Sequence, residues 1–145
     1  MTSTVTSLPR PVPPDPAQLV AIVDDDEAVR RALTRLVKAY SYSVQTYPSG
    51  REFLDSLKIG VPACLIVDLQ MNDMTGLELL HHLARTGLRI PTIVATADDE
   101  PGMRHRCKLA GAVAFLVKPV MSDPLLEAIE NAMSATENAD ARANS

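Results

Sequence analysis

The sequence predicts an α/β fold in which five parallel strands form one sheet with helices on both of its faces. Short apolar runs alternate with helical patterns five times along the chain of 145 residues. The runs are rich in Val and Ile, which is typical of strands buried on both faces of a parallel sheet. Right-handed crossovers through the intervening helices would complete a doubly wound sheet.

Four of these runs end in a polar side chain. Two of them end at Asp24 and Asp68, one at Lys118 and one at Thr96. In a doubly wound sheet, ligands bind in the crevice outside the carboxyl ends of the strands. We therefore expect these side chains to converge there and to form a site.

The first part of the chain contains two predicted strands, at residues 19–23 and 43–47. Between them, apolar side chains recur at helical spacing over residues 27–40, which predicts an amphipathic helix. Ser49 stands three residues before a glutamate, and this capping-box spacing predicts a helix that ends near Leu57.

The third strand is expected at residues 63–67, and a loop follows it. Thr75 and Glu78 have the spacing of a second capping box, which predicts the start of another helix. The fourth strand covers residues 92–95 and ends at the hydroxyl of Thr96. The helix after the third strand is expected to bury Leu77, Leu80 and Leu83.

The acidic residues 98–100 precede Pro101 and favour a helix start, because carboxylates stabilise the positive N-terminus of a helix. Gly111 suits the left-handed C-cap of that helix. The fifth strand is expected at residues 114–117, and Asp123-Pro124 opens the last helix with proline at a tolerated position. The apolar face of this helix comprises Leu125, Ile129, Ala132 and Met133.

Composition indicates one folded domain over residues 19–134, between a Pro-rich disordered arm at 1–18 and a small, polar, disordered tail at 135–145. No apolar run reaches the length of a membrane span or of a signal-peptide core. Cys64 and Cys107 are expected to be reduced thiols of a cytoplasmic protein. The net charge of -4 and the 3% aromatic content argue against nucleic-acid binding.

Crowded carboxylates at one strand end repel each other, and their pKa values rise unless a cation neutralises them. Asp24, Asp25 and Asp68 offer hard oxygen ligands, a set that suits Mg²⁺ with several waters and a phosphate. The spacing of a Ca²⁺ loop is absent. Neither zinc-ligand spacing nor a cysteine pair accompanies the histidines, which are His81, His82 and His105.

Lys118 adds a positive charge beside the acids, and Pro119 after it admits a cis peptide bond. A structural ion pair is the simpler interpretation of such a lysine. Together with Mg²⁺ and the hydroxyl of Thr96, however, an ammonium group can hold a phosphoryl group during transfer. Asp68 stands apart from the three consecutive acids, so we expect it to be the nucleophile that forms an aspartyl phosphate.

At this point the chain resembles the receiver domain of bacterial two-component response regulators. The resemblance covers about residues 19–134 and implies a flavodoxin-like sheet of strand order 2-1-3-4-5 with five helices. The motifs on which it rests are Ile22-Val23-Asp24-Asp25-Asp26, Ile66-Val67-Asp68, Met71-Asn72-Asp73-Met74-Thr75-Gly76, Ala95-Thr96-Ala97 and Val117-Lys118-Pro119.

The resemblance implies that Asp68 is the phosphoacceptor and that Asp25 binds Mg²⁺ directly, as Asp68 also would. Asp24 would act on the metal mainly through water, and the backbone carbonyl of Gln70 would complete the protein ligands. Asp26 matches no ligand position, and we expect it to cap the following helix.

Thr96 and Lys118 would bind the phosphoryl oxygens, and Phe115 occupies the position of an aromatic switch that moves with Thr96. The chain departs from the family pattern at Asn72, where proline is usual, and at Val120, where phenylalanine is frequent. Gln70 and Asp98 occupy positions that modulate dephosphorylation in the family, so the lifetime of the phosphoryl group stays open.

The implied function is that of a phosphorylatable response regulator in a phosphorelay, and not of a conventional enzyme. A sensor histidine kinase or a phosphotransfer protein would supply the phosphoryl group. The output would be contact with a downstream protein or a phosphorylation-dependent homodimer, without contact to nucleic acid or membrane.

Three alternatives remain at this stage. A Mg²⁺-dependent phosphohydrolase with an aspartyl nucleophile would need threonine or valine where the chain has Ala28. A degenerate receiver that acts only as a binding module would normally lack an acid, Thr96 or Lys118. The amino-terminal half of a transcription factor would have its DNA-binding part elsewhere, because the tail at 135–145 is too short for a helix-turn-helix.

Overall fold

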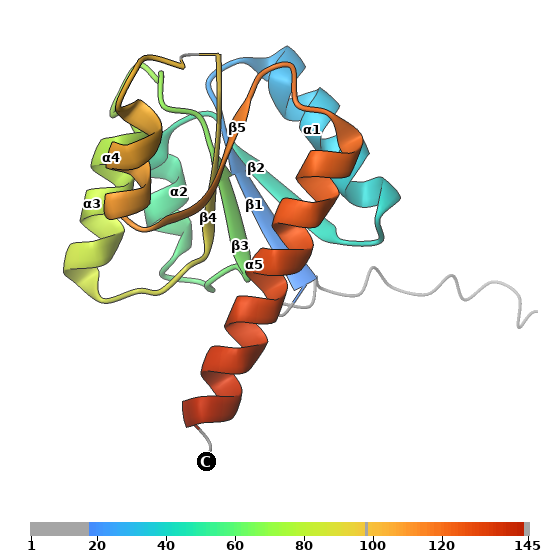
Figure 1. The fold of residues 1–145 in the computed structure, drawn as a ribbon, viewed down its shortest axis with the longest axis vertical. Coiled ribbons are helices and arrows are strands. Elements are labelled where there is room, and N and C mark those ends of the chain that lie inside the picture. Colours follow the sequence, from blue (N-terminus) through green and yellow to red (C-terminus); the bar gives the residue numbers. More distant parts are fainter. Residues whose placement is uncertain (1–17, 98, 144–145) are drawn as a thin grey trace, which may run out of the picture.

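The computed structural model describes residues 18–97 and 99–143 and has the predicted fold class (Figure 1). Five parallel strands form one sheet in the order β2-β1-β3-β4-β5. The strands are β1 (Leu19–Val23), β2 (Ser43–Tyr47), β3 (Cys64–Val67), β4 (Thr92–Thr96) and β5 (Ala112–Val117). The helices are α1 (Glu27–Ala39), α2 (Gly50–Ser56), α3 (Gly76–Thr86), α4 (Met103–Leu109) and α5 (Ser122–Ala143).

Helices cover both faces of the sheet, with α1 and α5 on one face and α2, α3 and α4 on the other (Figure 1). Successive side chains of a strand point to opposite faces, so each strand supplies both layers of the core. In β1, Ile22 packs toward Leu33 and Ile129, whereas Val23 belongs to the cluster with Phe53 and Leu79. The three inner strands therefore consist of almost continuously buried residues, as the apolar runs predict.

Local capping fixes where several helices begin. Asp26 precedes α1, and its carboxylate accepts hydrogen bonds from the backbone amides of Ala28 and Val29. Thr75 and Glu78 form a complete capping box at α3. At α2, the hydroxyl of Ser49 accepts the amide of Glu52 at 3.2 Å. The three predicted caps are thus present, and each satisfies helix amides that have no intrahelical partner, but of the two predicted capping boxes only that of α3 has both of its hydrogen bonds.

The start of α4 differs from the prediction. The helix begins only at Met103, after Gly102 in a left-handed conformation (φ 86°), and it has no acid in its first turn. Pro101 and Gly102 form a turn that separates the acidic segment from the helix, so the predicted charge–dipole stabilisation is wrong here. Asp98 lies outside the described residues. Gly111 has the expected left-handed φ of 111° beyond the helix end.

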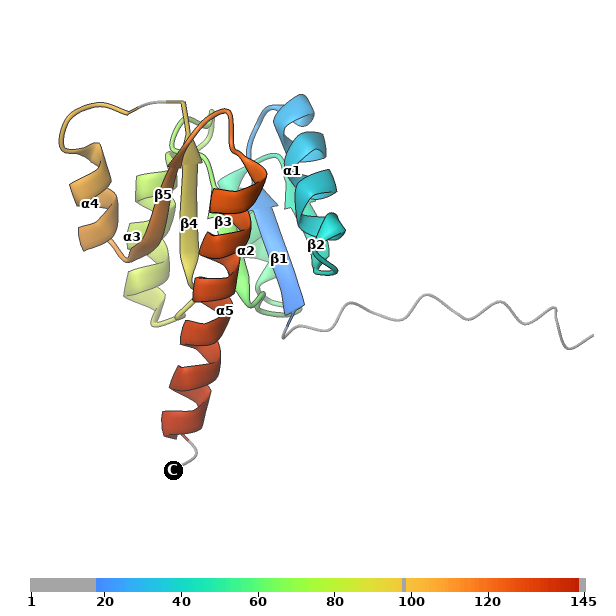
Figure 2. The ribbon, with the colours of Figure 1, turned by 45° about the vertical axis from the view of Figure 1, so that its right-hand side comes forward.

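The last helix is longer than predicted. α5 continues to Ala143 and extends past the end of the sheet, whereas the sequence pattern had suggested a frayed tail from residue 135 (Figure 2). Residues 135–143 contain four alanines with Glu and Arg and lack Gly and Pro, a composition that allows the helix to continue. Residues 1–17, most of the predicted arm, and 144–145 lie outside the described residues.

Two smaller observations complete the fold. In α3, Leu80 and Leu83 are buried as predicted, and Leu77 is half-buried and packs against the same cluster; Leu79, which the sequence pattern did not single out, is fully buried beside them. Cys64 and Cys107 are buried free thiols, and burial raises the pKa of Cys64 to about 12. Among the described residues, the helices are too polar or too short to span a bilayer.

Candidate functional site

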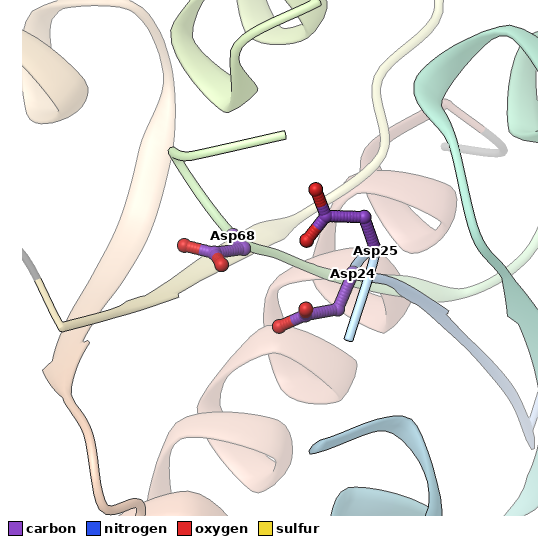
Figure 3. Close-up of side chains that lie close together, drawn as sticks. All are labelled: Asp24, Asp25 and Asp68. Atoms are coloured by element: carbon purple, nitrogen blue, oxygen red, sulfur yellow. The ribbon is translucent and has the colours of Figure 1, made fainter. Parts of the chain in front are cut away.

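The strand order places the predicted acids next to each other. β1 and β3 are neighbours, and Val23 pairs with Val67, so Asp24 and Asp68 follow side by side at the carboxyl edge of the sheet. The amide of Asp68 donates to the carbonyl of Val23 at 3.1 Å and fixes this arrangement. With Asp25, they offer three carboxylate oxygens that lie within 4.8 Å of one another (Figure 3).

The three carboxylates differ in burial. Asp24 is 2% exposed and Asp68 is 8% exposed, whereas Asp25 faces solvent. Burial raises the pKa of Asp24, the nearby charge of Asp68 raises it further, and the hydrogen bonds from Lys118 and the amide of Asp26 only partly oppose the shift. The site therefore holds an energetically costly negative charge, which is the situation that a bound cation relieves.

Lys118 supplies part of that positive charge. Its Nζ donates to Asp24 Oδ2 at 2.7 Å and to Asp68 Oδ2 at 3.0 Å. Burial by itself would lower the pKa of Lys118, but the two hydrogen bonds outweigh it and the pKa is raised. The predicted structural ion pair is therefore present, and it lies within the acidic cluster.

β4 and β5 bring the hydroxyl-bearing residue and the lysine to the same edge. Thr96 is fully buried and pairs with Val117, and its carbonyl accepts the amide of Lys118 at 2.8 Å. The Lys118–Pro119 peptide bond is cis. The four polar run ends that the sequence indicated thus meet at one edge of the sheet.

The remaining predicted residues lie around this cluster. The amide of Gln70 donates to Asp68 Oδ1 at 3.2 Å, and Asp26 serves as the cap of α1. Phe115 is half-buried on β5, with the guanidinium carbon of Arg104 at 4.9 Å from the centroid of its ring. The histidines stand apart from the acidic cluster, with His81 and His105 exposed on α3 and α4.

Two contacts at the site could not be read from the sequence. Arg30 Nη1 donates to the backbone carbonyl of Asp24 at 2.6 Å, and the carboxylate of Asp73 binds amides at the start of α2. Both contacts join a side chain to a backbone group of another element. The spacing of residues in the sequence does not predict a hydrogen bond of this kind.

We expect Asp24→Asn to raise the free energy of unfolding at pH 7 without Mg²⁺. A folded-state pKa raised above 3.8 means that Asp24 stabilises the fold at low pH and that this contribution is lost as the pH rises through the folded-state pKa. The single amide oxygen can still accept from Lys118, but the amide of Asp26 loses its acceptor Oδ1, so we expect the gain to be small. Urea unfolding should show the gain at pH 7 and none at pH 3.5, and Asp26→Asn should show no comparable gain.

The sequence matches known proteins over the region that forms this site. Residues 20–130 match the response regulator receiver domain. The response regulator protein TodT of Pseudomonas putida is 36% identical over 119 residues, which is 82% of this chain and 52% of TodT. Nodulation protein W of Bradyrhizobium diazoefficiens is 36% identical over 119 residues, covering 82% of this chain and 51% of that protein. The chain spans about half the length of these curated relatives.

Solved structures share the fold. The amino-terminal part of FixJ is 36% identical, with a TM-score of 0.74 over 80% of this chain and 93% of that structure. A CheY-like receiver domain protein from Methanospirillum hungatei is 26% identical, with a TM-score of 0.77 over 83% of this chain and 97% of that one. The acidic cluster, the sheet order and these matches agree, and the chain belongs to the family of response regulator receiver domains, which are phosphoacceptors and not conventional enzymes.

Proposed function

We propose that this chain is a cytoplasmic response regulator whose receiver, over about residues 19–134, accepts a phosphoryl group on Asp68. A histidine kinase or a phosphotransfer protein would supply that group. The observation that supports this most is the placement of Asp68 beside two further carboxylates, with the Lys118 ammonium 3.0 Å from its Oδ2.

The donor set fits Mg²⁺. Asp24, Asp25 and Asp68 provide hard oxygen atoms, and the exposure of Asp25 leaves room for the water ligands that Mg²⁺ retains. The carbonyl of Gln70 is proposed as the remaining protein ligand, with Asp24 acting mainly through water. Bound Mg²⁺ would offset the charge of the carboxylates and of the phosphoryl oxygens.

In the proposed reaction, a carboxylate oxygen of Asp68 attacks the phosphorus atom of the donor. A P–O bond to Asp68 forms while the bond from phosphorus to the donor breaks, and the donor group leaves with that electron pair. Lys118 stabilises the negative charge on the phosphoryl oxygens, and the hydroxyl of Thr96 donates to one of them. The product is an aspartyl phosphate.

The direct test uses the full chain with acetyl phosphate and Mg²⁺, followed by measurement of the intact mass. We expect a gain of one phosphoryl group that EDTA prevents and that hydroxylamine removes, because hydroxylamine cleaves acyl phosphates. No gain in mass, or an equal gain in the presence of EDTA, would refute the proposal.

Phosphorylation is expected to move Thr96 toward the phosphoryl oxygens and to let the ring of Phe115 turn inward, a rearrangement that one covalent group can drive between states a few kcal/mol apart. In the structure the ring is half-buried under Arg104, so it has an outward contact to lose. NMR with a phosphoryl mimic should show shifts in residues 98–125. Shifts confined to 24–26 and 68 would contradict the switch.

The output is proposed to be contact with another protein. The net charge is -4, and the basic cluster Arg104-His105-Arg106 is short, which disfavours binding to a nucleic-acid backbone by this chain. Light scattering with and without a phosphoryl mimic distinguishes a homodimer, whose mass doubles, from a receiver that docks on a different partner. Salt-sensitive binding to duplex DNA at physiological ionic strength would contradict the proposal.

A further inference from the structure

The loop that follows the phosphoacceptor is tied to a neighbouring helix by one side chain. We call residues 68–75 the acceptor loop. Within it, Asp73 Oδ2 accepts the amide of Arg51 at 2.9 Å, and Asp73 Oδ1 accepts the amide of Gly50 at 3.3 Å. These amides belong to the first two residues of α2, and amides at that position have no partner within the helix.

A second contact joins the same two segments. A Cβ atom placed on Gly50 would lie 2.7 Å from both Cγ and Sδ of Met74, so the Met74 side chain packs directly against the backbone at the start of α2. Asp73 and Met74 together attach the middle of the acceptor loop to a rigid element. The backbone hydrogen bonds also outweigh the effect of burial and lower the pKa of Asp73, so its carboxylate stays charged at neutral pH.

The other side of the acceptor loop carries the proposed chemistry. The amide of Gln70 donates to Asp68 Oδ1, and the amide of Gly76 donates to the carbonyl of Leu69 at 3.0 Å. Between Gln70 and Asp73 the loop contains Asn72, which lacks the fixed φ that a proline would impose. The conformation of this segment is therefore set by hydrogen bonds, both those of Asp73 to α2 and those within the loop, in which the Asp73 carboxylate also accepts from the amide of Met74.

We propose that Asp73 is a positioning residue for phosphoryl transfer. By anchoring the acceptor loop to α2, it holds the Gln70 carbonyl and the Asp68 side chain in the arrangement that receives the cation and the phosphoryl group. The proposal rests on the proposed function of Asp68. Groups held in place by neighbouring contacts bind a metal more tightly, because less order has to be imposed on binding.

Ser49 offers a matched control. Its hydroxyl also caps α2, through the amide of Glu52, and the hydrogen bonds of that hydroxyl go to Glu52 and not to the acceptor loop. Asp73→Ala and Ser49→Ala should therefore both weaken the start of α2, but only Asp73→Ala releases the loop. Asp73→Asn should release the loop only in part, because its single side-chain carbonyl oxygen can still accept a hydrogen bond from the amide of Arg51.

The experiment measures Mg²⁺ affinity by calorimetry, the rate of phosphorylation by acetyl phosphate, and urea unfolding for all four proteins. We expect Asp73→Ala to lose about tenfold in Mg²⁺ affinity, the lower end for outer-shell partners of a metal site, and to be phosphorylated correspondingly more slowly. Ser49→Ala should match the wild type in Mg²⁺ affinity and in the rate of phosphorylation. Asp73→Asn should have values of both between those of the wild type and of Asp73→Ala.

If Asp73→Ala and Ser49→Ala lost Mg²⁺ affinity and phosphorylation rate equally, the inference would be overturned, since the effect would then come from the stability of α2 alone. If Asp73→Ala fails to fold, Asp73→Asn provides the test. A wild-type Mg²⁺ affinity and phosphorylation rate in Asp73→Asn would overturn the inference. Lower values of both in Asp73→Asn, with wild-type values in Ser49→Ala, would support it. A wild type that takes up no phosphoryl group would refute the proposed function and this inference together. Normal uptake by both wild type and Asp73→Ala would refute the inference alone.

Discussion

Replacing Asp68 by asparagine should abolish uptake of the phosphoryl group from acetyl phosphate and Mg²⁺. The substitution keeps the size of the side chain, and its amide oxygen can still accept the backbone N–H of Gln70, which donates to Asp68 Oδ1 at 3.2 Å. It removes the anionic nucleophile and one of the two acceptors for the Lys118 ammonium. Intact mass spectrometry should therefore show no phosphoryl adduct within the time in which the wild type is fully modified.

Asp26→Asn is the control for this result. It makes the same change of charge two residues from Asp24, but Asp26 caps α1 and lies outside the acidic cluster, and asparagine is an equally good N-cap. This variant should take up one phosphoryl group at nearly the wild-type rate. A hydroxylamine-sensitive adduct of normal lability on Asp68→Asn would show that another residue is the acceptor.

The convergence of Asp24, Asp68, Thr96 and Lys118 could be predicted from the sequence because it depends on two simple facts. Each residue directly follows an apolar run long enough for a buried strand, and parallel strands place their carboxyl ends at one edge. The order of the strands, in contrast, could not be predicted from residue patterns. No periodicity specifies which strand lies beside which, so the order 2-1-3-4-5 came from the family resemblance, and the structure confirms it.

The contacts between elements could not be predicted in this way. The bond from Asp73 to Arg51 joins residues 22 positions apart, and the stacking of Arg104 on Phe115 depends on the direction of a side chain on α4. The predicted start of α4 and the predicted end of α5 were wrong for another reason. Local signals compete there, and the turn at Gly102 delays α4, while an alanine-rich segment extends α5 to Ala143.

We expect Gly76→Ala to lower the free energy of unfolding by about 3 kcal/mol, at the upper end of the usual cost of overpacking. A Cβ atom at Gly76 would lie 2.4 Å from the carbonyl oxygen of Asp68 and 3.1 Å from Cα of Leu69. Both are backbone atoms of the segment that directly follows β3, and a rotamer change cannot move them. The gain in helix propensity from glycine to alanine is only about 1 kcal/mol and does not offset the clash. Urea unfolding without Mg²⁺ measures the loss.

Gly50→Ala is a close control, because Gly50 and Gly76 are both the first residue of a helix after a hydroxyl N-cap. The Cβ at Gly50 would meet the Met74 side chain, which can rotate away, so this variant should lose clearly less stability. The rate of phosphorylation should also fall more in Gly76→Ala, because that clash acts directly on the backbone of Asp68, whereas in Gly50→Ala the hydrogen bonds from the amides of Gly50 and Arg51 to Asp73 still hold the acceptor loop. Equal stability losses in the two variants would show that the end of β3 yields as readily as a methionine side chain, and the rigid placement of Asp68 would then need another source.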